Sequence, residues 1–408
     1  MDLRKAEEED DANSTMAAGG GEVDSSFALR SFLDRIPIAS IPDLNLSSKS
    51  CVVPELKPDD CVLDAINLMY KNNVSGAMIV ENVDTDFQTF VNRHIGFIEF
   101  SSLVLWSLEE FSNVNAENKI SDHGFLSALE QTSQIARTKI GELAKLFLWE
   151  PFFPIYEHDS LFHASLLFSK HHRLNVIPVV NSSNPTVVGF VTQNAALQLL
   201  LQSSGLDWFD KITDKALSDF RFKDASRPIF IFSDQSLADV LHIMWEEQLD
   251  GVAVVGRKTG TLVGCVRRSD VYLLLEDDSI FGKRKTLTAE DFIKSSARTS
   301  DRSSSAEVES DRNTLCLKNE QLPEMTAPVS SRNTDSLKQA MQNLVASRSG
   351  CSFMVDESGH VKGFVTARDI ISVFSPLCMD SRIDGGSFFS TALEQAGCHV
   401  EGGVIIEN

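Results

Sequence analysis

The sequence predicts an α/β (α+β) protein made of four copies of one β-α-β-β-α unit, and three observations support this fold class. One order of segments recurs four times along the 408 residues, which is the mark of a repeat architecture. In each copy, a helical segment carries apolar residues three and four positions apart, so one helix face is apolar. Two short strands rich in Val, Ile and Phe follow, and such nearly continuous apolar strands are typical of strands buried between helices.

The fourth copy, residues 327–376, shows every element in order. A short extended stretch comes first, and the apolar period predicts a helix over Asp335–Ala346. Two strands are predicted next, Ser352–Val355 and Val361–Val365, with turn residues between them. A second helical period covers Arg368–Phe374.

The other three copies span residues 51–106, 149–202 and 227–276. All four align on one glycine of the last strand, which is Gly96, Gly189, Gly264 or Gly363. A unit of about 50 residues buries too little surface to be stable alone. We therefore expect the four units to fold as two pairs.

The net charge of −21, from 58 acidic and 37 basic residues, disfavours binding to nucleic acids and to anionic membranes. The acidic N-terminus lacks the apolar core of a signal peptide, and no apolar run approaches the roughly 18 residues of a membrane span. Seven cysteines without a CxxC pair are typical of reduced thiols. These features predict a soluble protein of the cytoplasm, or also of the nucleus.

These repeats resemble the cystathionine-beta-synthase (CBS) domain, and four in tandem resemble the gamma subunits of AMP-activated and sucrose-non-fermenting-related kinases. Segments 32–42, 205–210 and 285–292 resemble plant members of that group. The resemblance covers residues 27–376 and implies two back-to-back pairs, or Bateman modules, in a disc. The predicted organisation is a disordered acidic N-terminus at 1–25, repeats at 27–115, 138–203, 215–278 and 318–376, a flexible Ser-rich linker at 297–313, and a tail at 377–408.

The resemblance also implies ligand residues, because the family grips the ribose of an adenine nucleotide with a [Ser/Thr]-x-x-Asp motif. Repeat four has this motif intact from Thr366 through Arg368 to Asp369, and repeat three keeps Asp270 but has Arg267 in place of the hydroxyl residue. We predict these four ligand residues: Thr366, Arg368, Asp369 and Asp270. Ser102 and Ala195 take the aspartate position in repeats one and two, which are not expected to hold ribose.

Each ligand residue has a structural alternative. A Thr followed three residues later by an acid also caps a helix, so Thr366 and Asp369 fit capping alone as well as capping with nucleotide contact. For Asp270 the alternative is a solvated first-turn acid stabilised by the helix dipole. Repeat four also has Gly350 and Cys351 where sensing gamma subunits place a His-Arg pair, which argues against nucleotide sensing.

Two further groups of side chains are candidates for sites. His163, His171 and His172 lack a Cys or acidic partner at ligand spacing, so no metal is predicted. Trp208 and Phe209 fit partner docking and interdomain packing equally.

No catalytic motif is present, so we predict no enzyme activity and no catalytic residues. The resemblance implies a regulatory subunit that binds a kinase catalytic alpha subunit and a beta scaffold subunit. It implies no required cofactor, with AMP, ADP or ATP as regulatory ligands. Two alternatives remain: a free-standing sensor of an adenosyl metabolite, and a ligand-free scaffold for protein contacts.

Overall fold

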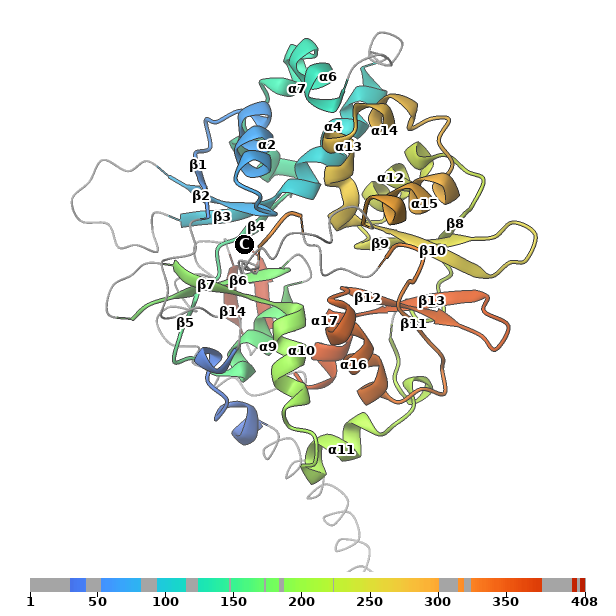
Figure 1. The fold of residues 1–408 in the computed structure, drawn as a ribbon. Helices are drawn as coiled ribbons and strands as arrows, with labels where there is room; N and C mark the ends of the chain where they lie inside the picture. Colours follow the sequence, from blue (N-terminus) through green and yellow to red (C-terminus); the bar gives the residue numbers. More distant parts are fainter. Residues whose placement is uncertain are drawn as a thin grey trace, which may run out of the picture.

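The computed structural model describes residues 30–41, 53–81, 94–114, 124–146, 148–171, 174–182, 187–222, 224–300, 315–318, 324–375, 398–401 and 404–407. It confirms the predicted mixed fold of four β-α-β-β-α repeats (Figure 1). In each repeat the first strand runs parallel to the second, and the second pairs antiparallel with the third.

The first two repeats lie on one side of the molecule (Figure 1). Repeat one consists of β1 (Glu55–Leu56), α2 (Val62–Lys71), β2 (Gly76–Val80), β3 (His94–Glu99) and α4 (Phe100–Asn113). Repeat two consists of β5 (Ile155–Tyr156), α9 (Leu161–Lys170), β6 (Val176–Val180), β7 (Val187–Thr192) and α10 (Gln193–Leu201).

The other two repeats lie opposite (Figure 1). Repeat three consists of β8 (Phe230–Phe232), α12 (Leu237–Glu246), β9 (Gly251–Val255), β10 (Leu262–Arg267), the 3₁₀ segment η4 (Arg268–Tyr272) and α13 (Leu273–Glu276). Repeat four consists of β11 (Ser330–Ser331), α16 (Leu337–Ser347), β12 (Cys351–Val355), β13 (Val361–Thr366) and α17 (Ala367–Val373).

Further elements precede the first repeat or connect one repeat with the next. They are η1 (Ile38–Ser40), α6 (Phe125–Gln131), α7 (Ser133–Ala136), α8 (Ile140–Leu143), η2 (Ala144–Leu146), β4 (Trp149–Pro151), α11 (Asp207–Thr213), η3 (Leu217–Asp219), α14 (Asp278–Lys283) and α15 (Ala289–Ser300). A hairpin of β14 (Cys398–Glu401) and β15 (Val404–Glu407) lies within the predicted tail.

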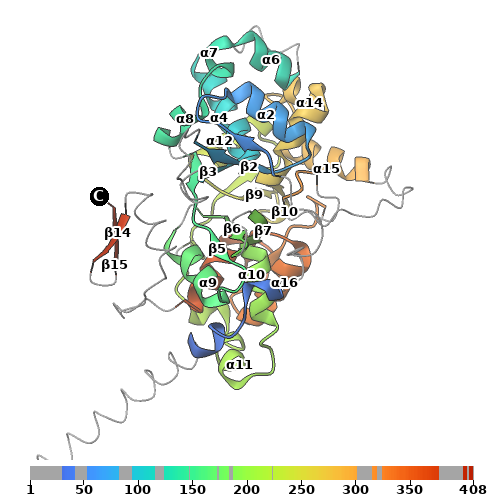
Figure 2. The ribbon, with the colours of Figure 1, turned by 90° about the vertical axis from the view of Figure 1, so that its left-hand side faces the viewer.

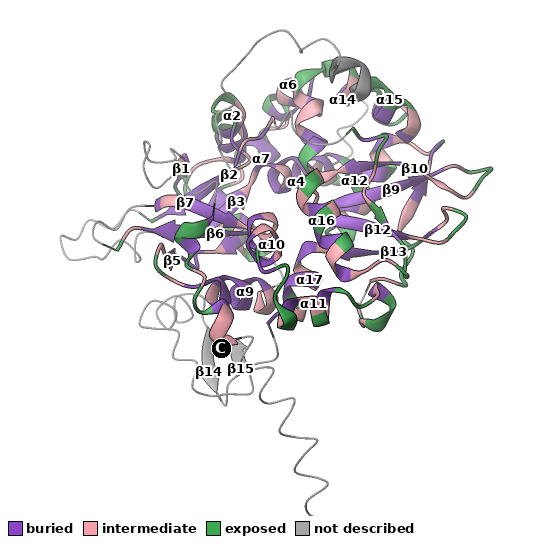
Figure 3. Cartoon of the chain, turned by 60° about the horizontal axis from the view of Figure 1, so that its bottom comes forward, coloured by how far each residue is buried: buried purple, intermediate pink, exposed green. Residues whose placement is uncertain are grey.

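The repeats form a disc of two modules, which is seen face-on in Figure 1 and from its edge in Figure 2. Sheets of repeats one and two face each other, with the rings of Phe97 and Phe190 5.8 Å apart. Helices join the modules: α4 packs on α12, α9 packs on α17, and α10 packs on α16 and α17. Two large cores result, and each crosses the boundary between the modules; Figure 3 shows the buried strands and inner helix faces in purple.

In repeats three and four, close packing against a neighbouring backbone requires the glycine on which the repeats align. A Cβ added at Gly363 would lie 2.3 Å from the carbonyl oxygen of Asp224, and one added at Gly264 would lie 2.8 Å from that of Met325. Those carbonyls accept hydrogen bonds from the next residue of each strand, Phe364 at 3.0 Å and Cys265 at 2.9 Å. Each glycine therefore lets the backbone leading into the other repeat of its module lie against β10 or β13.

The segment leading into each repeat docks on the other repeat of its module. Four isolated bridges show this exchange: Pro37 with Ser160, Lys139 with Cys61, Ala216 with Ser336, and Thr288 with Ser236. Segment 32–42 thus includes residues that dock on repeat two. The tilted rings of the half-buried Trp208 and Phe32 lie 4.8 Å apart, and the buried Phe209 stacks on Phe374 of repeat four at 5.7 Å, so Phe209 has the interdomain packing role that one of the two interpretations expected.

Two parts of the predicted organisation differ from the structure or lie outside it. Residues 297–300 of the predicted linker continue α15, while 301–313 and the N-terminal 1–25 lie outside the described residues. Across the parts of the chain that are described, no helix combines the length and apolar character needed to cross a bilayer.

Candidate functional site

Two cavities of about 500 Å³ each lie where the four repeats meet. We call the first the Arg348 cavity; its polar lining includes Asn194, Gln198, Asp250, Arg267, Arg268 and Arg348. We call the second the Asp369 cavity; its lining includes Glu150, Asp224, Arg227, Thr366, Arg368 and Asp369. Glu99, Asn175, Gln193, Asp250 and Arg268 line both, so a polar partition separates the two.

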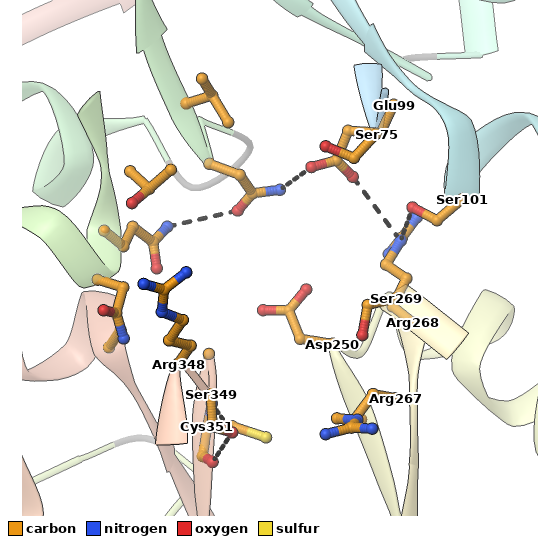
Figure 4. Close-up of a pocket in the computed structure, with 18 of the residues that line it drawn as sticks. Ser75, Glu99, Ser101, Asp250, Arg267, Arg268, Ser269, Arg348, Ser349 and Cys351 are labelled. Atoms are coloured by element: carbon orange, nitrogen blue, oxygen red, sulfur yellow. Dashed lines mark hydrogen bonds and ion pairs between the residues drawn. The ribbon is translucent and has the colours of Figure 1, made fainter. Parts of the chain in front are cut away.

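Equivalent positions of the four repeats build the Arg348 cavity. The residue directly before the second strand of each repeat lines it, namely Ser75, Asn175, Asp250 and Gly350. Arg348 ends α16 in the left-handed conformation, with φ of 48°, and its exposed side chain reaches into the cavity toward Asp250 (Figure 4). Arg348 thus supplies a cation that residues 350 and 351 themselves lack. The sequence did not predict this placement, because a left-handed turn at an arginine leaves no recognisable pattern.

Thr366 and Asp369 form a reciprocal cap at the start of α17. The Thr366 hydroxyl and N–H donate to Asp369 Oδ2 at 2.6 and 2.9 Å, and the Asp369 N–H donates back to Thr366 Oγ1 at 3.1 Å. The capping geometry that this spacing predicts is therefore present. Both residues and Arg368 are half-buried and line the Asp369 cavity, and their ligand role stays a prediction.

Asp270 lies apart from that cavity. Its side chain is 5% exposed, and Arg267 donates to both carboxylate oxygens, Nε to Oδ2 at 2.9 Å and Nη2 to Oδ1 at 3.0 Å. The alternative of a solvated acid is wrong, because the structure buries and pairs this carboxylate. A ribose hydroxyl would have to displace Arg267 to bind here, so the predicted ligand role requires that pair to open.

In repeat one, Arg268 occupies the space next to Ser102, the residue at the aspartate position of the motif. It reaches across the module boundary and donates to the hydroxyls of Ser101 at 3.2 Å and Ser102 at 3.1 Å, while its Nε lies 3.9 Å from a Glu99 oxygen. Ser102 stands where an aspartate would bind ribose. An arginine of repeat three therefore occupies that place and ties the two modules together.

Two carboxyl groups lie beside Asn175: the half-buried Glu99 of the partition and the buried Glu150 of the Asp369 cavity. Asn175 donates from its backbone to Glu150 at 3.1 Å and from its side chain to Glu99 at 3.3 Å. Burial raises the pKa of Glu99, and it raises the pKa of Glu150 well above the ordinary value, where the neighbouring Glu99 adds repulsion. Arg268 opposes the shift in both pKa values.

Two of the histidines considered as metal ligands lie beside an acidic or an aromatic side chain. His163 lies 3.8 Å from Asp159, and the ring of His171 packs 4.3 Å from that of Phe153. His172 lies outside the described residues. Among the residues whose positions are known, no three His, Cys, Asp or Glu side chains are placed to hold a metal ion.

Comparison with known proteins agrees with this architecture. The sequence profile of the CBS domain matches residues 140–202, 222–277 and 322–376. The SNF1-related protein kinase regulatory subunit gamma-1 of Arabidopsis thaliana is 23% identical over 369 residues, which is 84% of this chain and 82% of the relative. The Arabidopsis gamma-1-like subunit is 22% identical over 411 residues, covering 85% and 86%.

A solved structure shows the same fold. Protein MJ1225 from Methanocaldococcus jannaschii, a proposed archaeal homologue of g-AMPK, superposes with a TM-score of 0.50 and 18% identity, covering 80% of this chain and 97% of that protein. Three segments of the chain thus match the CBS domain, and the chain as a whole is similar to the plant gamma-like regulatory subunits of SNF1-related protein kinase.

Proposed function

We propose that this protein is a non-catalytic, gamma-like regulatory subunit of an SNF1-related serine/threonine kinase complex. The observation that carries the proposal is the extent of the similarity, which covers 84% of this chain and 82% of a gamma subunit. Two hydrophobic cores contain residues of both modules, and such shared cores suit a scaffold because they hold the modules together.

The test is reconstitution of the complex. Full-length protein is mixed with a plant kinase alpha subunit and a beta scaffold subunit, and complexes are separated by size-exclusion chromatography. We expect a ternary complex of equal stoichiometry, with a weaker or undetectable complex when the beta subunit is left out. Separate elution of all three proteins would refute the assignment.

We also propose that an adenine-bearing ligand binds in the Asp369 cavity. The support is that the intact Thr366 to Asp369 motif lines a cavity large enough for such a ligand. AMP, ADP and ATP are the ligands that the resemblance implies. One observation favours the alternative of an adenosyl-metabolite sensor: carboxylates outnumber guanidinium groups around this cavity.

A further inference from the structure

We propose that the Asp369 cavity selects an adenine nucleoside and rejects the corresponding phosphorylated nucleotide. The inference rests on the proposed function only in taking adenine as the base of the ligand. The new element is the preference for an uncharged ligand over a phosphorylated one.

The charged lining of the Asp369 cavity is predominantly negative. Three guanidinium groups, Arg227, Arg268 and Arg368, face six carboxyl groups: Glu99, Glu150, Asp224, Glu247, Asp250 and Asp369. Even with Glu150 protonated, the carboxylates remain in excess. A phosphate placed among them loses hydration and meets charge of its own sign.

Arg227 and Arg268 are held by existing contacts. Arg227 donates to both oxygens of Glu247, at 2.9 and 2.7 Å. Arg268 bonds the two serine hydroxyls of repeat one and lies beside Glu99. Neither is positioned to clamp a phosphate without breaking an existing contact, whereas a nucleotide site normally offers free cations.

The rest of the cavity suits an uncharged nucleoside. Its apolar wall consists of Leu146, Leu148, Trp245, Leu249 and Phe364, and Leu146 is 55% exposed. A flat base packed on this wall would cover apolar surface that is now open to water. The hydroxyl groups of a ribose are donors, and the carboxylates of the same lining are acceptors.

The Arg348 cavity has the opposite character and supplies a control. Three guanidinium groups, from Arg267, Arg268 and Arg348, face two carboxylates, Glu99 and Asp250. Arg348 is exposed and reaches into this cavity (Figure 4). A substitution at Arg348 leaves the lining of the Asp369 cavity intact.

Calorimetric titration of the full-length protein with adenosine and with AMP tests the inference. We expect adenosine to bind at least tenfold more tightly than AMP. Asp224→Asn removes a negative charge from the lining while keeping the side-chain shape, and it should increase the affinity for AMP severalfold relative to the affinity for adenosine. Arg348→Gln should change neither affinity. Thr366→Ala should weaken adenosine binding at least tenfold, because it disrupts the motif.

Three results would overturn the inference: AMP affinity equal to or above that of adenosine, no binding of either compound at millimolar concentration, or an equal response of both to Asp224→Asn. Circular dichroism confirms that each variant is folded. Assembly with the kinase subunits is measured without ligand. Failure to assemble would refute the regulatory-subunit proposal but not the charge selectivity of the cavity. Failure of the charge selectivity would leave the regulatory-subunit proposal unaffected.

Discussion

At the scale of single residues, two threonines that cap helices allow the capping role of Thr366 to be distinguished from its predicted role in ligand binding. Thr366 caps α17 through the Asp369 N–H at 3.1 Å, and Thr192 caps α10 through the Ala195 N–H at 3.2 Å. Only Thr366 is followed by the acid of the motif. The two positions therefore form a matched pair within one chain.

We predict that Thr366→Ala and Thr192→Ala each lower the free energy of unfolding by about 1 kcal/mol, because each removes an N-cap. Urea titration measures this loss. Only Thr366→Ala should also reduce adenosine affinity. If both variants reduced affinity equally, the ligand role assigned to repeat four would be wrong.

Glu150 predicts a pH dependence of stability. Its pKa is raised in the folded state by burial, so the folded protein holds this proton at a pH where the unfolded chain has released it. Stability falls as the pH rises from the ordinary carboxyl range through the raised pKa. Glu150→Gln cannot ionise and should be more stable than the wild type at neutral pH, with the advantage vanishing below about pH 4. Melting temperatures across this range test it, and a difference independent of pH would contradict the assignment.

At the scale of elements, the last strands of repeats three and four are each fitted to a neighbouring backbone. A Cβ at Gly363 would overlap the backbone of Asp224 and Ala225, whereas one at Gly251 would meet Cys351 Sγ at an ordinary 3.6 Å. We predict that Gly363→Ala destabilises the protein by about 3 kcal/mol or more, because β13 must shift from its partner. Gly251→Ala should cost less than about 1 kcal/mol. Chemical denaturation ranks the two, and equal losses would show that the contact at Gly363 relaxes freely.

At the scale of the whole molecule, the two modules share their cores. One core joins helices of repeats one and three, the other those of repeats two and four, and Arg268 links repeats three and one. We predict a single calorimetric unfolding transition for the disc, since neither module can open without exposing both cores. Two resolved transitions, the first reproduced by a fragment ending at residue 204, would contradict this coupling.

Much of the organisation is readable from local pattern. In repeat four, apolar spacing predicts a helix over Asp335–Ala346 and α16 spans Leu337–Ser347; it predicts a strand over Ser352–Val355 and β12 spans Cys351–Val355. The Ser-rich, charged composition of residues 297–313 predicts a flexible linker, yet residues 297–300 extend α15, whose first turns are held by the buried Phe292 and Ile293. The composition of a segment does not show that buried residues earlier in the same helix stabilise it.

The sequence by itself determined the repeat, its internal order and the position of the intact Thr366 to Asp369 motif, because periodic apolar residues and short motifs are local properties of the chain. Only the tertiary structure decided which charges share a cavity. Arg267 closes over Asp270, Arg268 enters the place of Ser102, and Glu150 joins the cavity of Asp369 from a distant part of the chain. These contacts between residues distant in sequence depend on how the modules pack, and they determine the charge of the Asp369 cavity.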